Sequence, residues 1–316
     1  MLCKVLARLV GWIEEIRVVV QSIDTHGIGG VDPIIGFRRD EIQGDQHVHM
    51  LADFRDPWTF IDFYDKLRLN PFSDSLHHRM EGEVLNSAGA LVTVSWSWAE
   101  QFKKLCNREV NVITNGFDEE DFPNETIEPD KKFSLHHFGS MNGDRNPHIL
   151  WDVLSELSGQ DNDFRNDLEI CFTGKTDYTV IESLNKLQLM KNSRFDDYVK
   201  HSEAVRKMRS SQILLLPLND TPNISGIIPG KIFEYLAAHR PILLIGDENG
   251  DSSIILNSCK AGLTCNFRDK DKLKNIILSY YRHYKNDALE IKSESILQFT
   301  RKGNAEKMAE LLNEIC

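Results

Sequence analysis

The segment Gly226-Ile-Ile-Pro-Gly-Lys-Ile-Phe-Glu-Tyr-Leu-Ala-Ala-His-Arg-Pro-Ile-Leu-Leu-Ile-Gly246 is the most informative part of this 316-residue chain. A Gly/Pro loop leads into a short helix, and Pro229 suits the first turn because its missing N–H would have no partner there. Arg240-Pro241 ends the helix, and residues 242–245 have the composition of a buried strand. The segment therefore predicts a loop–helix–strand unit of an α/β protein.

The start of this predicted helix carries residues that suit a nucleotide. A helix N-terminus offers backbone N–H groups and the positive end of the dipole, which attract phosphate. We expect Gly230 and Lys231 to form this end of the site. Glu234, one turn further, would accept hydrogen bonds from a ribose diol. An ordinary helix with a surface Lys and Glu is the alternative, because such motifs discriminate loosely.

Strands and helices alternate along the rest of the chain. The expected strands cover 50–54, 90–94, 110–114, 133–138, 168–173, 197–199, 213–217, 242–245 and 262–265. The expected helices cover 75–86, 98–105, 147–157, 178–189, 203–210, 229–238, 252–258, 270–284 and 288–315. Such alternation with short links predicts a parallel, doubly wound sheet.

The length indicates two domains, because single hydrophobic cores stop growing near about 250–300 residues. An acidic run over 118–121, followed by Pro123 and Pro129, is typical of an interdomain linker. We expect an N-terminal domain over 1–118, a linker over 119–132, a C-terminal domain over 133–285 and closing helices over 286–316.

Composition excludes several classes of protein. A formal net charge of −11 argues against a nucleic-acid-binding surface, which needs a basic face. The six cysteines include no C-x-x-C pair, so neither a zinc site nor a disulfide framework is indicated. Scattered thiols of this kind are typical of a reducing cytoplasm. The histidine pairs have no cysteine or carboxylate at a metal-ligand spacing, so we expect no metal.

The first 20 residues bear on membrane contact. They are apolar, but Glu14 and Glu15 interrupt them, which disfavours a signal peptide. They fit a docked surface helix, which we favour, or an amphipathic helix on a membrane. No uninterrupted apolar stretch approaches the length of a spanning helix. We expect a cytoplasmic protein, with peripheral contact at the inner face of the membrane as the alternative.

Further segments, in chain order, resemble retaining glycosyltransferases of the GT-B superfamily, of the family 4 type. They are Leu51–Thr59, Ala90–Ser95 with Val112–Asp118, His137–Ser140 with Arg145–Pro147, and Tyr198–His201 leading to Ile213–Pro217. The resemblance implies an α/β, GT-B-like protein with two Rossmann-like domains and parallel sheets. It also implies a nucleotide-diphosphate sugar as donor and no metal cofactor. Because the family has more β/α units before the Asp53-Phe-Arg-Asp-Pro-Trp58 segment, we expect an incomplete N-terminal domain.

The resemblance also implies where the donor binds. Gly139 and Ser140 would meet the diphosphate, since a glycine lets the backbone approach a phosphate closely. Arg145 would bind it bidentately, or is only a solvated loop arginine. His201 falls at the turn where the base commonly packs, or is only a helix-entry residue.

Cationic groups at this site would serve the chemistry of sugar transfer. Breaking the sugar–phosphate bond leaves extra negative charge on the nucleoside diphosphate, which the helix end, Lys231 and Arg145 would stabilise. Many relatives carry a His-Asp that touches the donor sugar where this chain has Arg55 and Asp56.

Both assignments near the sugar have alternatives. Arg55 and Asp56 could instead pair with each other and brace the loop around Trp58. The first of two glutamates common in the family falls at Gly226, so Asn223 or Ser225 would hold the sugar hydroxyls instead.

We therefore expect a hexosyltransferase that acts with retention on an unknown glycan or lipid-linked acceptor, in polysaccharide or glycoconjugate synthesis. Two alternatives stay open. A nucleotide-sugar epimerase shares the fold, and a degenerate, non-catalytic relative would only bind nucleotide or contact a partner. The short N-terminal domain and Gly226 favour the non-catalytic alternative.

Overall fold

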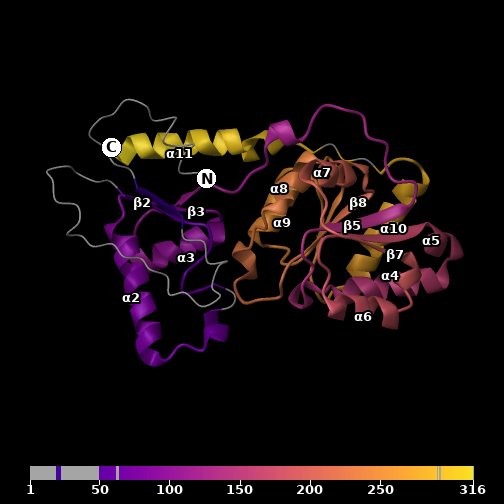
Figure 1. The fold of residues 1–316 in the computed structure, drawn as a ribbon, viewed down its shortest axis with the longest axis horizontal. Helices are drawn as coiled ribbons and strands as arrows, with labels where there is room; N and C mark the ends of the chain where they lie inside the picture. The colour runs from indigo at the N-terminus through magenta and orange to yellow at the C-terminus, as the bar shows by residue number, and fades with distance from the viewer. Residues whose placement is uncertain (1–18, 23–49, 62–63, 290, 292, 316) are drawn as a thin grey trace. The chain divides into compact units, whose positions relative to one another are not determined.

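The computed structural model describes residues 19–22, 50–61, 64–289, 291 and 293–315, which form two compact units (Figure 1). The first unit holds the described residues of Met1–Thr114 and of Ala305–Cys316. The second unit is Asn115–Asn304, so the predicted linker 119–132 is grouped with it. The expectation for residues 1–20 lies almost entirely outside the described residues.

The first unit contains a parallel sheet in the order β1-β2-β3-β4. Its elements are β1 (Val19–Ser22), β2 (Met50–Phe54), η3 (Tyr64–Leu67), α2 (Pro71–Ser87), β3 (Ala90–Thr93), α3 (Trp96–Cys106) and β4 (Asn111–Val112). Side-chain caps set both helix starts: Asn70 Oδ1 accepts from the Phe72 and Ser73 amides, and Ser95 Oγ accepts from the Trp98 amide.

The last helix, α11 (Arg301–Ile315), contributes to the core of the first unit. Met308 and Leu312 are buried in one cluster with Leu51, Val92 and Ile113. The sheet of the first unit therefore buries one face against the C-terminal end of the chain.

The second unit is built on a parallel sheet in the order β10-β9-β8-β5-β6-β7. Its strands are β5 (Phe133–Phe138), β6 (Leu168–Thr173), β7 (Ser193–Asp196), β8 (Ile213–Pro217), β9 (Ile242–Ile245) and β10 (Gly262–Cys265). Its helices are α4 (His148–Gln160), α5 (Asn162–Asp167), α6 (Tyr178–Lys186), α7 (His201–Ser210), α8 (Lys231–Ala237), α9 (Asp251–Ser258) and α10 (Lys270–Lys285). Short 3-10 turns are η4 (Glu119–Asp121), η5 (Gly143–Arg145), η6 (Met190–Asn192), η7 (Ile224–Gly226) and η8 (Ile296–Phe299).

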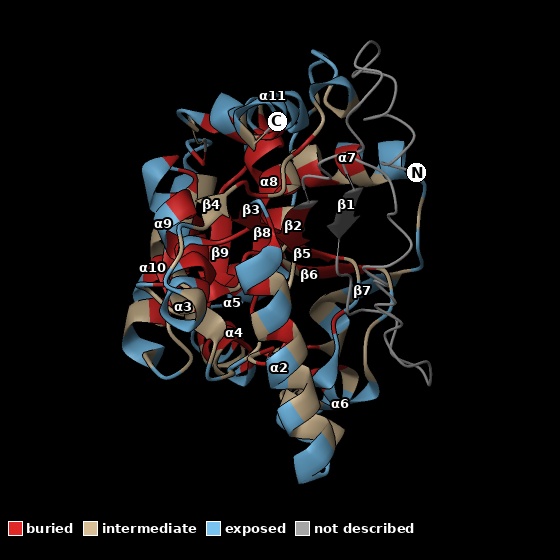
Figure 2. Cartoon of the chain, turned by 90° about the vertical axis from the view of Figure 1, so that its left-hand side faces the viewer, coloured by how far each residue is buried: buried red, intermediate tan, exposed pale blue. Residues whose placement is uncertain are grey.

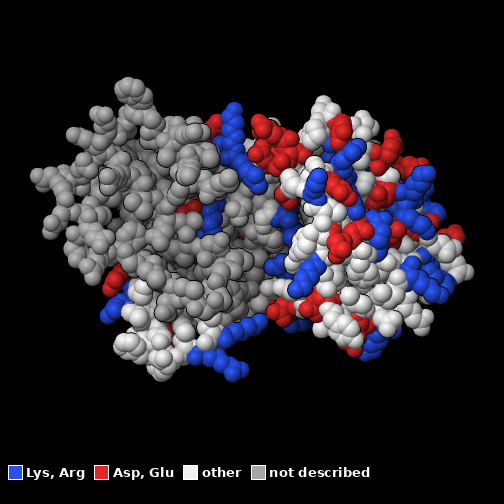
Figure 3. All heavy atoms as spheres, in the orientation of Figure 1, with Lys and Arg blue, Asp and Glu red and all other residues white. Residues whose placement is uncertain are grey.

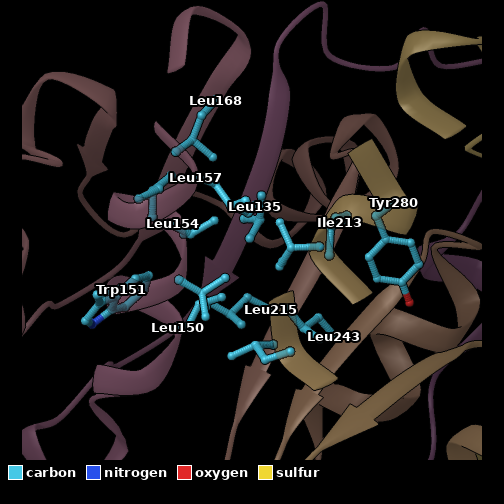
Figure 4. Packing of buried hydrophobic residues seen from close by; sticks show 14 of the residues in the cluster. Leu135, Leu150, Trp151, Leu154, Leu157, Leu168, Ile213, Leu215, Leu243 and Tyr280 are labelled. Carbon is cyan, nitrogen blue, oxygen red and sulfur yellow. The ribbon is translucent and has the colours of Figure 1, made fainter. Parts of the chain in front are cut away.

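Helices cover both faces of this second sheet. Leu135, Leu215 and Leu243 belong to a cluster with α4 and α10 (Figure 4), whereas Leu214 and Leu244 belong to a cluster with α8 and α9. Neighbouring residues of a strand point to opposite faces, so β8 and β9 are buried throughout (Figure 2). This explains why both strands are continuous apolar runs rather than alternating ones.

Two expected elements have wrong bounds. The strand expected over 197–199 is β7, four residues earlier in the chain (Ser193–Asp196), where Phe195 stacks on Phe172 with ring centroids 5.0 Å apart. The expected helix over 288–315 begins only at Arg301, because Ser295 has a left-handed backbone and Thr300 forms a bridge to Phe117. Helix α5, capped by Asp161, was not expected.

Charges of both signs are interspersed over the face of the second unit that Figure 3 shows. Within the described parts of the chain, no helix combines the length and apolarity needed to cross a bilayer.

Candidate functional site

A pocket of about 290 Å³ lies in the second unit, at the carboxyl ends of β5 and β6. It is lined by Phe138, Gly139, Thr173, Tyr198, Val199, His201, Ala204, Met208, Lys231 and Glu234. Open α/β sheets bind ligands at this edge. The pocket brings together four residues predicted from the sequence: Gly139, His201, Lys231 and Glu234.

Two glycines shape the strand ends beside the pocket. Gly139 has φ +86° and its amide donates to Thr173 O at 2.8 Å, while Gly174 has φ +119°. A Cβ at Gly174 would lie 2.8 Å from Gly139 O, and a Cβ at Gly139 would lie 3.5 Å from Lys231 Nζ. These positions need glycine, and they leave the end of β5 open to the lysine.

Lys231 is held at the end of β5. Its Nζ donates to Phe138 O at 2.7 Å and lies 3.4 Å from His137 Nε2. Burial, reinforced by the Arg145 guanidinium, lowers the pKa of Lys231 to about 8, although Glu234 opposes the shift. A partly buried ammonium whose pKa is lowered by a second positive charge is poised to receive an anion.

Glu234 faces the same pocket and is only 24% exposed. Burial raises the pKa of its carboxyl, against the opposing effect of His201. His201 Nε2 lies 3.1 Å from Asp121 Oδ2 and 4.0 Å from Glu234 Oε1. His201 thus lies between Asp121 of η4 and Glu234, the residue predicted to bind the ribose.

The start of α8 lies next to Lys231. Gly230 is exposed. The amides of Ile232 and Phe233 already donate to Pro229 O and Gly230 O. Among the described residues, the amides of Gly230 and Lys231 have no hydrogen-bond acceptor. Two amides are therefore available to a ligand, fewer than a long helix would offer.

Tyr198 is a pocket residue that the sequence did not single out. Its side chain is 67% exposed, and its hydroxyl lies 2.8 Å from Ser140 Oγ, so Ser140 is paired with it. Val199, Ala204 and Met208 form an apolar wall nearby. The sequence predicted a strand over 197–199, whereas β7 ends at Asp196 and Tyr198 lies in the loop that follows. Tyr198 was therefore not predicted to line the pocket.

The remaining predicted residues of this unit do not line the pocket. Arg145 Nε donates to Asn219 Oδ1 at 3.0 Å, and its positive charge helps to lower the pKa of Lys231. Asn223 Oδ1 accepts from Thr221 Oγ1 at 3.1 Å. Ser225 Oγ donates to Asp247 Oδ2 at 2.6 Å, near the end of β9.

Gly226, where the resemblance to glycosyltransferases leads one to expect a glutamate, is buried in η7. Within the described ranges, no three His, Cys, Asp or Glu side chains converge as metal ligands would.

Arg55 and Asp56 belong to the first unit, directly after β2. Arg55 Nε and Nη2 both lie 2.8 Å from Asp53 Oδ2, so Arg55 is paired with Asp53. The following loop is fixed by Trp58 Nε1, which donates to His77 Nδ1 at 3.1 Å.

No protein-family model matches the sequence, and no curated protein matches it. Solved structures do match. HepE from Anabaena, in complex with UDP-glucose, aligns with a TM-score of 0.62 at 15% identity over 84% of this chain and 72% of HepE. Sucrose-phosphate synthase from Thermosynechococcus elongatus aligns with a TM-score of 0.61 at 12% identity over 86% of this chain and 69% of the synthase.

A third similar structure is WaaG, described as a glycosyltransferase involved in lipopolysaccharide biosynthesis. It aligns with a TM-score of 0.57 at 13% identity over 84% of this chain and 78% of WaaG. Another similar structure is S. aureus TarM, of whose length this chain spans 52%. At such low identity the likeness concerns the fold, and it agrees with the parallel sheets of both units. The chain therefore has the GT-B fold, with two Rossmann-like domains.

Proposed function

We propose that this chain is a glycosyltransferase that moves a sugar from a nucleotide-diphosphate sugar to an acceptor. The observation that carries the proposal is one pocket in which Lys231 and Glu234, from the same helix, meet the glycine end of β5. A half-buried ammonium beside open backbone suits a diphosphate, and a half-buried carboxylate suits a ribose diol. The GT-B fold, shared with HepE bound to UDP-glucose, supports this assignment.

In this proposal the protein stabilises the departing nucleoside diphosphate. The Lys231 ammonium, the Gly230 and Lys231 amides and the charge of Arg145 act on the negative charge that develops as the sugar leaves. Arg55 and Asp56 contact the donor sugar or the acceptor. We propose that the reaction needs no metal and retains the anomeric configuration.

The base would lie in the part of the pocket made by Tyr198, Val199, Ala204 and Met208. An aromatic ring and an apolar wall suit a flat base, since stacking tolerates any base with a π-face. Ser140 would then meet the diphosphate after releasing the Tyr198 hydroxyl.

For the acceptor we propose a glycan or lipid-linked precursor, in polysaccharide or glycoconjugate synthesis. The likeness of fold to WaaG, described as acting in lipopolysaccharide biosynthesis, supports this choice. A cytoplasmic location with peripheral membrane contact belongs to the same proposal.

Calorimetry with UDP, GDP and ADP tests the binding step. We expect one of them to bind, and Lys231→Met to weaken it by at least about tenfold. Lys260→Met is the matched control, because Lys260 is an exposed lysine paired with Glu294 and does not line the pocket. If no nucleoside diphosphate binds at millimolar concentration, the proposal is wrong. Retention is tested by NMR of the product's anomeric proton.

A second candidate is a nucleotide-binding protein without transferase activity. The buried Gly226 favours it, because no carboxylate stands where relatives place their first glutamate. Nucleotide binding without donor hydrolysis or transfer would support this candidate over the first.

A further inference from the structure

His137 lies beside Lys231 and is almost fully buried, with 1% of its surface exposed. It is the second-last residue of β5. Its Nδ1 lies 3.1 Å from Leu215 O, and its Nε2 lies 3.4 Å from Lys231 Nζ and 3.5 Å from Ser140 O. Both ring nitrogens therefore have polar neighbours.

The contact with Leu215 fixes which nitrogen of His137 carries hydrogen. Each ring nitrogen lies near a carbonyl oxygen, which can only accept, but the Nδ1–Leu215 O contact of 3.1 Å is shorter than the Nε2–Ser140 O contact of 3.5 Å, so we assign the hydrogen to Nδ1. Burial, Lys231 and Arg145 hold the pKa of His137 well below its ordinary value, so the ring is neutral at pH 7. Nε2 then has a lone pair that faces the Lys231 ammonium.

Lys231 has three N–H donors. One bonds to Phe138 O and a second is directed at His137 Nε2. Gly139 has no side chain between Lys231 Nζ and its backbone; a Cβ added there would lie 3.5 Å from Nζ. We propose that His137 is a positioning residue for the diphosphate, because it accepts from Lys231 and turns the remaining N–H of the ammonium toward the end of β5. This inference rests on the proposed function, which puts a diphosphate there.

The neighbouring His136 offers a matched control. It is also 1% exposed, but its Nδ1 lies 3.1 Å from Ser211 Oγ and its Nε2 lies 2.9 Å from Thr173 Oγ1. Its ring stacks on Phe138 with centroids 4.0 Å apart. Adjacent strand residues point to opposite faces, so only His137 reaches Lys231.

The test compares His137→Asn, His137→Gln and His136→Asn in the full chain. An Asn amide can replace Nδ1 and keep the bond to Leu215 O, but it does not reach Lys231. A Gln amide reaches the position of Nε2 and can accept from Lys231. The probes are UDP and inorganic pyrophosphate, measured by calorimetry at pH 7.5, with circular dichroism and thermal melting to check folding.

We expect His137→Asn to weaken both ligands about tenfold, and His137→Gln and His136→Asn to stay within about threefold of the unmodified chain. We also expect the pH at which UDP affinity falls to be lower in His137→Asn, because the ammonium has lost an acceptor that stabilises its charged form. A role in packing alone would not move that pH. Should His137→Asn fail to fold, the Gln variant still tests the proposal, because a folded His137→Gln that loses affinity would overturn it.

The proposal is overturned if His137→Asn binds UDP like the unmodified chain, or if His137→Gln loses affinity with its fold intact. It is also overturned if His136→Asn weakens binding as much as His137→Asn. These outcomes require that the unmodified chain binds UDP. If it binds no nucleoside diphosphate, the proposed function fails first and this inference with it.

Discussion

Diphosphate binding should weaken as the pH rises through about 8, because the Lys231 ammonium loses its proton there. Burial and Arg145 lower this pKa from 10.5, and a bound diphosphate would restore it by favouring the charged form. Above pH 8 the free site has lost this proton, so binding of the ligand must be accompanied by uptake of a proton from solution. If the bound diphosphate restores this pKa to 10.5, the free energy of binding differs by about 3 kcal/mol between a pH well below 8 and a pH well above 10.5.

Over an accessible range the effect is smaller. From pH 7 to pH 9 the affinity should fall about tenfold, and at pH 8 about half a proton should be taken up for each ligand bound. The terminal phosphate of UDP has a second pKa of about 6, so it is largely ionised between pH 7 and pH 9. Lys231→Met should bind more weakly at pH 7 and lose most of this pH dependence.

Calorimetry of UDP at pH 7, 8 and 9, in buffers with different ionisation enthalpies, measures affinity and proton uptake together. Lys260→Met serves as the control and should follow the unmodified chain. The reasoning is refuted if the affinity of the unmodified chain is constant over this range, or if Lys231→Met shows the same decline.

Three further predictions concern single side chains. Tyr198→Ala should weaken UDP about tenfold while leaving pyrophosphate within about twofold, and Tyr198→Phe should keep most of the affinity because the ring remains; equal losses for both ligands would contradict a role in base binding. Glu234→Gln should likewise weaken UDP about tenfold and spare pyrophosphate, since only the nucleoside carries the diol; calorimetry with both ligands measures this. Gly174→Ala should lower the free energy of unfolding by about 2 kcal/mol, because its φ is +119° and the new Cβ would lie 2.8 Å from Gly139 O. Urea unfolding measures this change, and Gly159→Ala in α4 is the control, with no heavy atom within 4 Å of the added Cβ and no expected loss.

The sheet of the second unit was largely predictable because its signals are local. The apolar runs of β8 and β9 and the intervening helix α8 follow from composition and from Pro229 and Pro241. Lys231 and Glu234 share a helix one turn apart, so their common direction could be predicted from helical geometry.

Other features depend on contacts between distant parts of the chain. β7 has a polar sequence and is held in the sheet by pairing with β6 and by the stack of Phe195 on Phe172, which no local pattern reveals. The loop after it therefore begins earlier than expected and brings Tyr198 to the pocket. The approach of His137 to Lys231 joins residues 94 positions apart and depends on how α8 sits over β5.

The core of the first unit includes Met308 and Leu312 from α11, close to the end of the chain. During synthesis these residues leave the ribosome after the whole second unit, so the sheet of the nascent first unit lacks this part of its core until the second unit has been made. Chains that stop before residue 305 should therefore expose this apolar face and be prone to aggregation or degradation, even though their pocket residues are all present.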